Sequence, residues 1–295
     1  MGVALSRPRL YIKREAPRQN PRMAQRPVIR LRPREGWRVR AGAPWAFSNE
    51  IVMSGGPKGL APGTIVDLAS DDGTPIGTGY FNSKSLIAVR LLGPPGISAD
   101  QDFFVAKFSR ALSLREQFYS EPYYRLIHAE ADGLPGLVVD RFADCCVLQV
   151  TAAGMEELTP LAIGALERVL APRVVILRND TPARALEGLS SYVGAVKGEA
   201  PERLPVMENG ARYFADLAGG QKSGWYYDQR ETRAYMARLC KGASVLDSYC
   251  YSGGFGILAA RSGAREVTFL DSSEGALNLA RAAAEANRSE EHTSE

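Results

Sequence analysis

A glycine-containing turn near the end of the chain carries the residue types best suited to binding a ligand. The sequence VLDSYCYSGGFG occupies positions 245–256, and Asp271 follows 24 positions after Asp247. The apolar run predicts a strand that ends in the turn, and the residues beyond the turn predict a helix. Gly253 and Gly254 have no Cβ, so the backbone there can approach a ligand closely. The chemistry indicated is small-molecule binding at the carboxyl end of a strand.

The acidic residues narrow the choice of ligand. Asp271 is predicted to end the next strand, where a carboxylate can accept hydrogen bonds from a ribose diol. Asp247 lies beside the turn, where it would repel a phosphate but suit an ammonium group. The turn contains GGFG rather than GxGxxG, and the chain has no GxxxxGK[ST], so pyrophosphate and triphosphate fit poorly. These features favour S-adenosyl-L-methionine, a nucleoside with a cationic amino-acid tail, over a purely structural glycine turn.

The elements that must position this turn alternate along the last third of the chain. We predict helices at residues 231–241, 254–262 and 273–287, and strands at 244–247 and 266–270. Strands alternating with helices of this length are typical of βαβ units and a parallel sheet.

The segments before residue 219 show a different pattern of apolar residues. Short β-type runs at residues 28–31, 64–68, 76–81 and 86–92, with a helical stretch at 34–40, predict a small β-barrel or sandwich. Further on, we predict helices at 99–119 and 155–170, strands at 125–130, 137–141, 146–151 and 173–178, and a hairpin at 204–207 and 212–216. The expected fold class is α/β multidomain: a small β-barrel over 27–96, an α+β middle domain over 99–218 and a partial Rossmann-like sheet over 219–287.

Composition limits the class of protein. The 295 residues are 45% hydrophobic and 23% charged, which is typical of a soluble globular protein. No apolar stretch approaches the roughly 18 residues that a membrane span needs. Two histidines, His128 and His292, and cysteines without CxxC spacing argue against a metal site. Four thiols without a secretory signal indicate a reduced, cytoplasmic protein; they are Cys145, Cys146, Cys240 and Cys250.

The charge is concentrated at one end. Residues 1–40 hold 12 Lys+Arg and 2 Asp+Glu, a net charge of +10, whereas the remainder holds 24 and 31, a net charge of −7. This asymmetry is consistent with a polyanion contact or with a solubilising tail. Residues 1–26 have no apolar periodicity and are predicted to be disordered. Residues 1–22 need not be translated, because Met23 opens the run that leads into the first strand.

Three ordered segments resemble the class I S-adenosylmethionine-dependent methyltransferases that modify C5 of a cytosine in 23S rRNA. They are GQKSGWYYDQR (220–230), VLDSYCYSGGFG (245–256) and VTFLDSSEGALNLARAAAEAN (267–287). Upstream, RVRAGAPWAFSNEI (38–51) is similar to the opening of that family's PUA domain, a small RNA-binding barrel. HAEADGLPGLVVDRFAD (128–144) is similar to its middle domain. The resemblance covers about residues 28–287.

The resemblance implies S-adenosyl-L-methionine as cofactor and RNA, specifically 23S rRNA, as partner. It assigns the methionine and adenosyl portions to Asp247, Tyr249, Gly253 and Gly254, and the ribose to Asp271 beside Ser272. Gln229 and Arg230 match the family's DQR signature and would border the same cleft. Their alternative role is packing at a helix N-terminus, where Asp228 would be the N-cap.

No catalytic residue is assigned within the chain. Methylation at cytosine C5 requires a thiolate that attacks C6 and makes C5 nucleophilic. In the resembled family this nucleophile comes from a later segment, so Cys250 is interpreted as a small turn residue. Cys145 and Cys146 are expected in a core strand, and Cys240 near a helix end has no assigned role.

Two other groups could act chemically but favour structural roles. Carboxylates flank the turn DGLPG, where they commonly accept backbone hydrogen bonds rather than form an acid/base pair or metal site; they are Glu130, Asp132 and Asp140. Three aromatic residues of the barrel could stack on bases, but are more often core; they are Trp37, Trp45 and Phe47.

The last eight residues, RSEEHTSE (288–295), have no apolar residue and resemble the translated read-through of a sequencing adaptor. We therefore expect the helix and the native gene sequence to end near Asn287. The family's Asp-Pro-Pro element and its nucleophilic cysteine are absent, so this chain is expected to be inactive. An open parallel edge also predicts poor solubility.

Two functions from other classes compete with this interpretation. One is a non-catalytic RNA-binding protein with a PUA domain and a degenerate methyltransferase fold. The other, a nicotinamide dehydrogenase, would need a GxGxxG after the first strand of the last domain, which the sequence lacks. The sequence is compatible with a homodimer.

Overall fold

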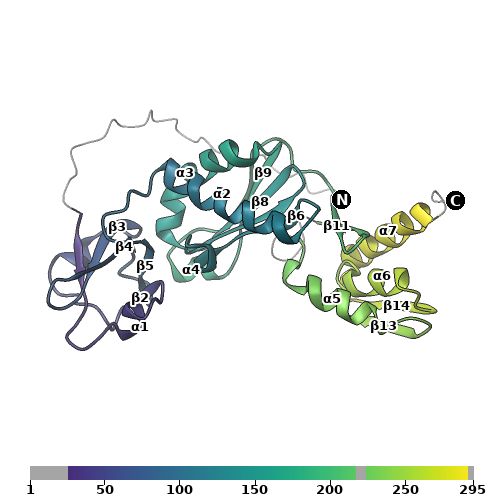
Figure 1. The fold of residues 1–295 in the computed structure, drawn as a ribbon, viewed down its shortest axis with the longest axis horizontal. Coiled ribbons are helices and arrows are strands. Elements are labelled where there is room, and N and C mark those ends of the chain that lie inside the picture. Colours follow the sequence, from purple (N-terminus) through teal and green to yellow (C-terminus); the bar gives the residue numbers. More distant parts are fainter. Residues whose placement is uncertain (1–25, 217–223, 292–295) are drawn as a thin grey trace, which may run out of the picture.

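The computed structural model describes residues 26–216 and 224–291, which form three parts along an elongated molecule (Figure 1). A small barrel lies at one end, an α+β domain lies in the middle, and two strand–helix units lie at the other end. The predicted α/β multidomain class is confirmed. Within these two ranges, no helix is both long enough and apolar enough to cross a bilayer.

The barrel is a five-stranded sheet with the order β1-β3-β4-β5-β2. Leu31 and Ile51 form a bridge beyond the two edge strands, and the Arg32 amide donates to the Glu50 carbonyl at 2.8 Å, which closes the sheet on itself. Its elements are β1 (Val28–Arg30), α1 (Trp37–Arg40), β2 (Trp45–Phe47), η1 (Gly56–Gly59), β3 (Thr64–Ala69), β4 (Pro75–Phe81) and β5 (Ile87–Gly93).

Parts of the barrel differ from the prediction. The three-residue strand β2 was not predicted, because so short a segment shows no alternation. The expectation that Trp37 is core is wrong: 65% of it is exposed, and the Arg38 guanidinium lies 5.1 Å from its ring centroid. Trp45 and Phe47 are half-buried.

The tail predicted to be disordered lies, except for its last residue, outside the part of the chain that the structure describes. Arg26 is described, and its Nη1 lies 3.7 Å from Oδ1 of Asp67 on β3. The rest of that tail, residues 1–25, lies outside the described residues.

The middle domain has a five-stranded sheet with the order β10-β9-β8-β7-β6, in which only β8 and β9 are parallel. Helix α2 begins after Asp100, whose carboxylate caps it by accepting from the Phe103 amide at 3.0 Å. The strand β10 and the short α4 were not predicted. The elements are α2 (Gln101–Phe118), β6 (Tyr123–His128), η2 (Ala129–Asp132), β7 (Leu137–Phe142), β8 (Cys145–Val150), α3 (Ala153–Leu170), β9 (Val174–Asn179), α4 (Ala183–Leu186) and β10 (Tyr192–Lys197).

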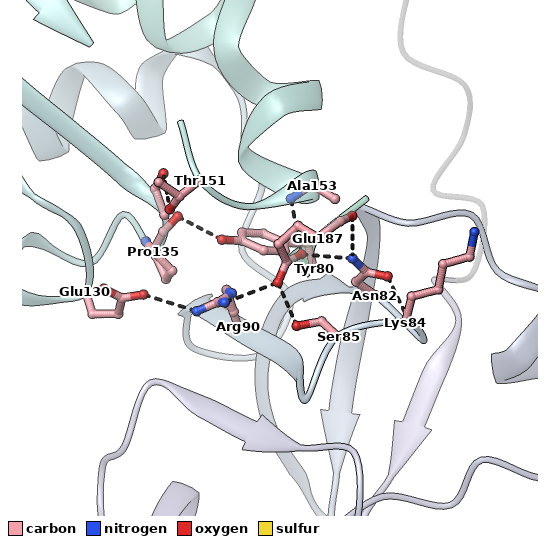
Figure 2. Close-up of polar contacts among 11 residues, drawn as sticks. Tyr80, Asn82, Lys84, Ser85, Arg90, Glu130, Pro135, Thr151, Ala153 and Glu187 are labelled. Atoms are coloured by element: carbon pink, nitrogen blue, oxygen red, sulfur yellow. Dashed lines mark hydrogen bonds and ion pairs between the residues drawn. The ribbon is translucent and has the colours of Figure 1, made fainter. Parts of the chain in front are cut away.

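Polar contacts fix the barrel against the middle domain (Figure 2). The carboxylate of Glu187 is 4% exposed and accepts from Asn82 Nδ2 at 2.9 Å and from Ser85 Oγ at 2.6 Å. Its Oε1 also lies 3.2 Å from Nη2 of Arg90. The Tyr80 hydroxyl donates to the Pro135 carbonyl at 2.8 Å. Because these groups are buried and mutually paired, the two parts are held in a defined orientation.

The last part begins with a hairpin and continues into a two-stranded parallel sheet. Residues 217–223, which include the start of the GQKSGWYYDQR segment, lie outside the described residues. The elements are β11 (Leu204–Glu208), β12 (Ala211–Ala215), η3 (Tyr227–Gln229), α5 (Arg230–Ala237), β13 (Ser244–Ser248), α6 (Gly254–Arg261), β14 (Glu266–Leu270) and α7 (Glu274–Glu291). The predicted alternation of strands and helices is present.

One hydrophobic core joins this part to the middle domain. Phe142 and Val147, on the face of the middle sheet, share it with Tyr213 of the hairpin and with Ile257 of α6. The predicted boundary near residue 218 therefore falls within a continuous core.

The end of α7 corrects an expectation. We expected the helix to stop at Asn287, but it continues to Glu291, and residues 292–295 lie outside the described residues. Residues 288–291 contain no Gly or Pro, so nothing in them stops a helix. Asn287 is buried, and its side chain bonds to both backbone groups of Arg212, at 3.0 and 2.7 Å, which fixes α7 to the hairpin.

Candidate cofactor-binding site

The turn after β13 has an unusual backbone conformation. Gly253 has φ +80° and leads directly into α6, a conformation that glycine adopts without strain. Tyr249 and Tyr251 also have positive φ angles, of 59° and 49°. Non-glycine residues rarely adopt this region, and such residues cluster at ligand sites. The backbone therefore supports the sequence-based interpretation of this turn.

The Asp247 side chain stabilises the turn through a hydrogen bond to the backbone. It is buried, and its Oδ2 accepts a hydrogen bond from the Gly256 amide at 2.8 Å. Burial raises the pKa of Asp247, the Gly256 hydrogen bond opposes this shift, and the nearby Asp271 charge adds to it. The carboxylate thus connects the end of β13 to the first turn of α6.

Asp271 holds the two loops of the site together. Its Oδ2 accepts from the Tyr251 amide at 2.8 Å, and its Oδ1 accepts from the Ser273 amide at 2.9 Å. Each carboxylate oxygen can accept more than one hydrogen bond. Asp271 can therefore bind hydroxyl groups of a ligand while its orientation is fixed by the backbone.

A cavity of about 550 Å³ opens at the carboxyl ends of β13 and β14. Of the eight residues predicted to bind cofactor, five line it: Gln229, Tyr249, Gly254, Asp271 and Ser272. Gly253 lies in the same turn, and Asp247 lies at the end of β13 and contacts the Gly256 amide. The other lining residues are Trp225, Tyr226, Arg233, Cys250, Tyr251, Ser252, Phe255 and Ser273.

Arg230 does not line this cavity. Its guanidinium lies 4.2 Å from the Tyr119 ring centroid, its Nε lies 3.2 Å from Glu208 Oε2, and it donates to the Tyr123 carbonyl. These contacts agree with the alternative of packing at the start of α5. Asp228 is not the N-cap: Gln229 has that position, and no side-chain hydrogen bond caps the helix.

Sequence reasoning missed Arg233, which is 3% exposed in its side chain and lines the cavity. Its spacing of three from Arg230 places the two cations on adjacent turns of one helix face, which was an available signal. Both contact Glu208, which lies 25 residues before Arg233 in the sequence. They differ in the ring that each guanidinium lies over, Tyr119 for Arg230 and Trp225 for Arg233.

Three of the four cysteines are buried, and burial raises the pKa of each. Burial raises the pKa of Cys250, the one that lines the cavity, to about 11, so it is a neutral thiol near pH 7. Cys145 and Cys146 are buried in β8, as predicted, and burial raises the pKa of each to about 12. This supports the interpretation of Cys250 as a turn residue.

The carboxylates around DGLPG are paired with arginines. Asp140 is fully buried and binds Arg125 at 2.8 and 3.0 Å. Asp132 Oδ2 lies 2.7 Å from Arg115 Nη2, and Glu130 Oε1 lies 3.4 Å from Arg90 Nη1. These pairs favour the structural role. Within residues 26–216 and 224–291, no cluster of three or more His, Cys, Asp or Glu could hold a metal.

Comparison with known families agrees with this geometry. Residues 29–94 match a PUA-like domain, and residues 139–292, more than half of the chain, match the S-adenosylmethionine-dependent methyltransferases. The chain belongs to the S-adenosylmethionine-dependent methyltransferase family. The cofactor of this family is the one that the turn sequence favours, and the matched range contains the whole cavity.

Curated relatives of this chain bear the name ribosomal RNA large subunit methyltransferase I. The protein from Shewanella denitrificans is 38% identical over 259 residues, covering 86% of this chain and 65% of the relative. The protein from Aliivibrio fischeri strain MJ11 is 36% identical, covering 85% of this chain and 64% of the relative. The chain thus spans slightly less than two thirds of the length of these relatives.

Solved structures share the fold of this chain. A Streptococcus mutans protein described as SAM-dependent superposes with a TM-score of 0.74 at 21% identity, covering 89% of this chain and 68% of that one. The structure of SMU.776, solved as a complex with SAH, superposes with a TM-score of 0.75 at 22% identity. The match covers 90% of this chain and 67% of that one. At these identities the likeness concerns the fold alone.

Proposed function

We propose that this chain binds S-adenosyl-L-methionine in the cavity at the ends of β13 and β14. The observation that carries the proposal is Asp271, whose carboxylate lines the cavity and is oriented by two backbone amides. It would accept hydrogen bonds from the ribose hydroxyls. Gly254 would allow the methionine portion to approach the backbone, since it lines the cavity and has no Cβ.

Gln229, Tyr249 and Ser272 complete the proposed binding set. They line the cavity, and the side chain of Tyr249 is 91% exposed. Asp247 and Gly253 would act by fixing the turn and the start of α6. The bound cofactor would supply an electrophilic methyl group, and the residues of this chain would bind and orient it.

We further propose that the substrate of the whole protein is RNA, and specifically a cytosine of 23S rRNA that is methylated at C5. The names of the curated relatives and the PUA-like barrel support an RNA substrate. The cytosine position rests on the sequence resemblance. We propose a cytoplasmic location, consistent with four free cysteines.

The chain of 295 residues is proposed to bind cofactor without methylating cytosine C5. That reaction needs a thiolate at the target base. Three of the four cysteines are buried and have raised pKa values. Cys240, the fourth, does not line the cavity, and its Sγ contacts the Met236 carbonyl at 3.2 Å.

Two measurements on the same protein test this proposal. Calorimetric titration should show S-adenosylhomocysteine binding, with affinity lowered about tenfold or more in Asp271→Asn, since one charge-assisted acceptor is lost. Incubation with tritiated cofactor and 23S rRNA should transfer no label. Transfer of label to C5 would contradict the proposed inactivity. RNA binding without any cofactor binding would instead establish the rival function, a non-catalytic RNA-binding protein.

A further inference from the structure

We infer that Arg233 binds the carboxylate of the cofactor's amino-acid portion, and that Glu208 positions it to do so. The inference rests on the proposed cofactor site and adds a residue and an interaction to it. Arg233 lies on α5 and reaches the wall of the cavity, opposite in charge to Asp271 in the same cavity.

The Arg233 guanidinium is fixed on its far side. Its Nε donates to Glu208 Oε1 at 2.7 Å, and its Nη2 lies 2.7 Å from the same oxygen and donates to the Tyr226 carbonyl at 2.7 Å. The second oxygen of Glu208 accepts from Trp225 Nε1 at 3.0 Å. Because Glu208 is itself buried on β11, the cation is held by the hairpin and not by solvent.

The remaining nitrogen of Arg233 is available to a ligand. Among the described residues, Nη1 has no hydrogen-bond partner, although only 3% of the side chain is exposed. This nitrogen lies toward Gly254, since a Cβ built there would stand 3.4 Å from Nη1. This nitrogen is not fully enclosed by protein atoms, so it can donate to an acceptor that enters the cavity.

The same wall carries further positive potential. Helix α6 begins at Gly254 and contributes the positive end of its dipole, and Gly254 and Phe255 both line the cavity. The guanidinium stacks over the Trp225 ring, with its Cζ 4.5 Å from the centroid, which orients its edge. The cavity is thus cationic at the α5–α6 wall and anionic at Asp271. A ligand with a carboxylate at one end and a ribose diol at the other matches this polarity.

The test combines a change in the protein with a change in the ligand. S-adenosylhomocysteine is compared with S-adenosyl-3-thiopropylamine, which lacks only the carboxylate, on the full chain and on Arg233→Gln. We expect Arg233→Gln to weaken S-adenosylhomocysteine about 10- to 100-fold, the range for a charge-assisted hydrogen bond, and to leave the analogue within about twofold. Arg233→Lys keeps the charge, so its affinity for S-adenosylhomocysteine should lie between those of the unmodified chain and of Arg233→Gln.

A matched control is Arg238→Gln, which removes the same charge from an exposed position at the end of α5 and should change neither affinity. Equal weakening of both ligands by Arg233→Gln would overturn the inference and leave Arg233 a structural residue. Arg233→Gln could fail to fold, and the unmodified chain and Arg233→Lys then decide. Equal affinity of the unmodified chain for both ligands would overturn the inference. A roughly 10-fold preference for S-adenosylhomocysteine that Arg233→Lys reduces would support the inference. Failure of the unmodified chain to bind either ligand would refute the proposed function itself.

Discussion

Asp247 shows how one side chain can serve the site from outside the cavity. Its carboxylate accepts from the Gly256 amide and is otherwise buried, so its contribution is to hold the glycine turn against α6. Burying a carboxylate disfavours its ionised form, which is why its pKa is raised. The residue therefore stabilises the local geometry at some expense to global stability near neutral pH.

The pH dependence of stability tests this role of Asp247. Because its pKa is raised above the ordinary 3.8, the folded state binds the proton more readily, and ionisation lowers stability as pH rises from about 3.8 through the folded pKa. Asp247→Asn keeps an acceptor for Gly256 and removes the charge. We expect a higher Tm than the unmodified protein at pH 7 and no difference below pH 3.8. Thermal unfolding measured by circular dichroism would refute this if the variant were less stable at pH 7.

The helix–sheet contacts that position the site depend on small residues. Gly256 of α6 lies against Phe269 of β14, and a Cβ there would stand 2.3 Å from the ring. Gly256→Ala should force α6 and the ring apart, lowering the free energy of unfolding by about 1–3 kcal/mol. Gly275→Ala, in α7 with only Ser273 Oγ within 4 Å, should instead be neutral or stabilising. Urea denaturation of both variants measures the difference, and equal effects would contradict this packing argument.

Sequence patterns located the elements of the site better than its side-chain contacts. The strand β14 was predicted with the residues that the structure shows, because its apolar pattern is clear and Asp271 ends it. The strand β10 was missed, since YVGAVK is interrupted by glycine and defined by pairing with β9. Arg230 and Arg233 could not be told apart, because their surroundings depend on Glu208 in a hairpin distant in the sequence. Trp37 was misplaced because residue type alone does not fix burial at a helix end.

At the scale of the whole molecule, buried polar contacts join the barrel to the rest of the chain (Figure 2). Glu187→Ala removes an acceptor shared by Asn82, Ser85 and Arg90 and leaves the Arg90 cation poorly paired. Breaking a buried pair in this way destabilises by about 3–5 kcal/mol. We expect faster proteolytic cleavage between barrel and middle domain. Asp102→Ala, which breaks the exposed pair with Arg168, should cost about 1 kcal/mol or less and serves as the control.

The two-stranded sheet at the other end exposes apolar surface. Helices α6 and α7 contact this sheet, whereas Leu246 and Leu270, which the pairing register places on the same face, are 63% and 56% exposed. Exposed apolar sheet surface promotes association. Leu246→Lys should therefore reduce self-association, measured by light scattering at increasing protein concentration. Identical scattering by both proteins would contradict this expectation.

The central claim is that S-adenosyl-L-methionine binds at the ends of β13 and β14, and its location can be measured directly. Ultraviolet crosslinking of radiolabelled cofactor to the full chain, followed by peptide mapping, should label peptides within residues 225–273. Unlabelled S-adenosylhomocysteine should compete with the label. Label confined to other peptides, such as those around the separate cavity of about 330 Å³ beside Phe118 and Tyr124, would contradict the account. So would labelling that the competitor does not reduce.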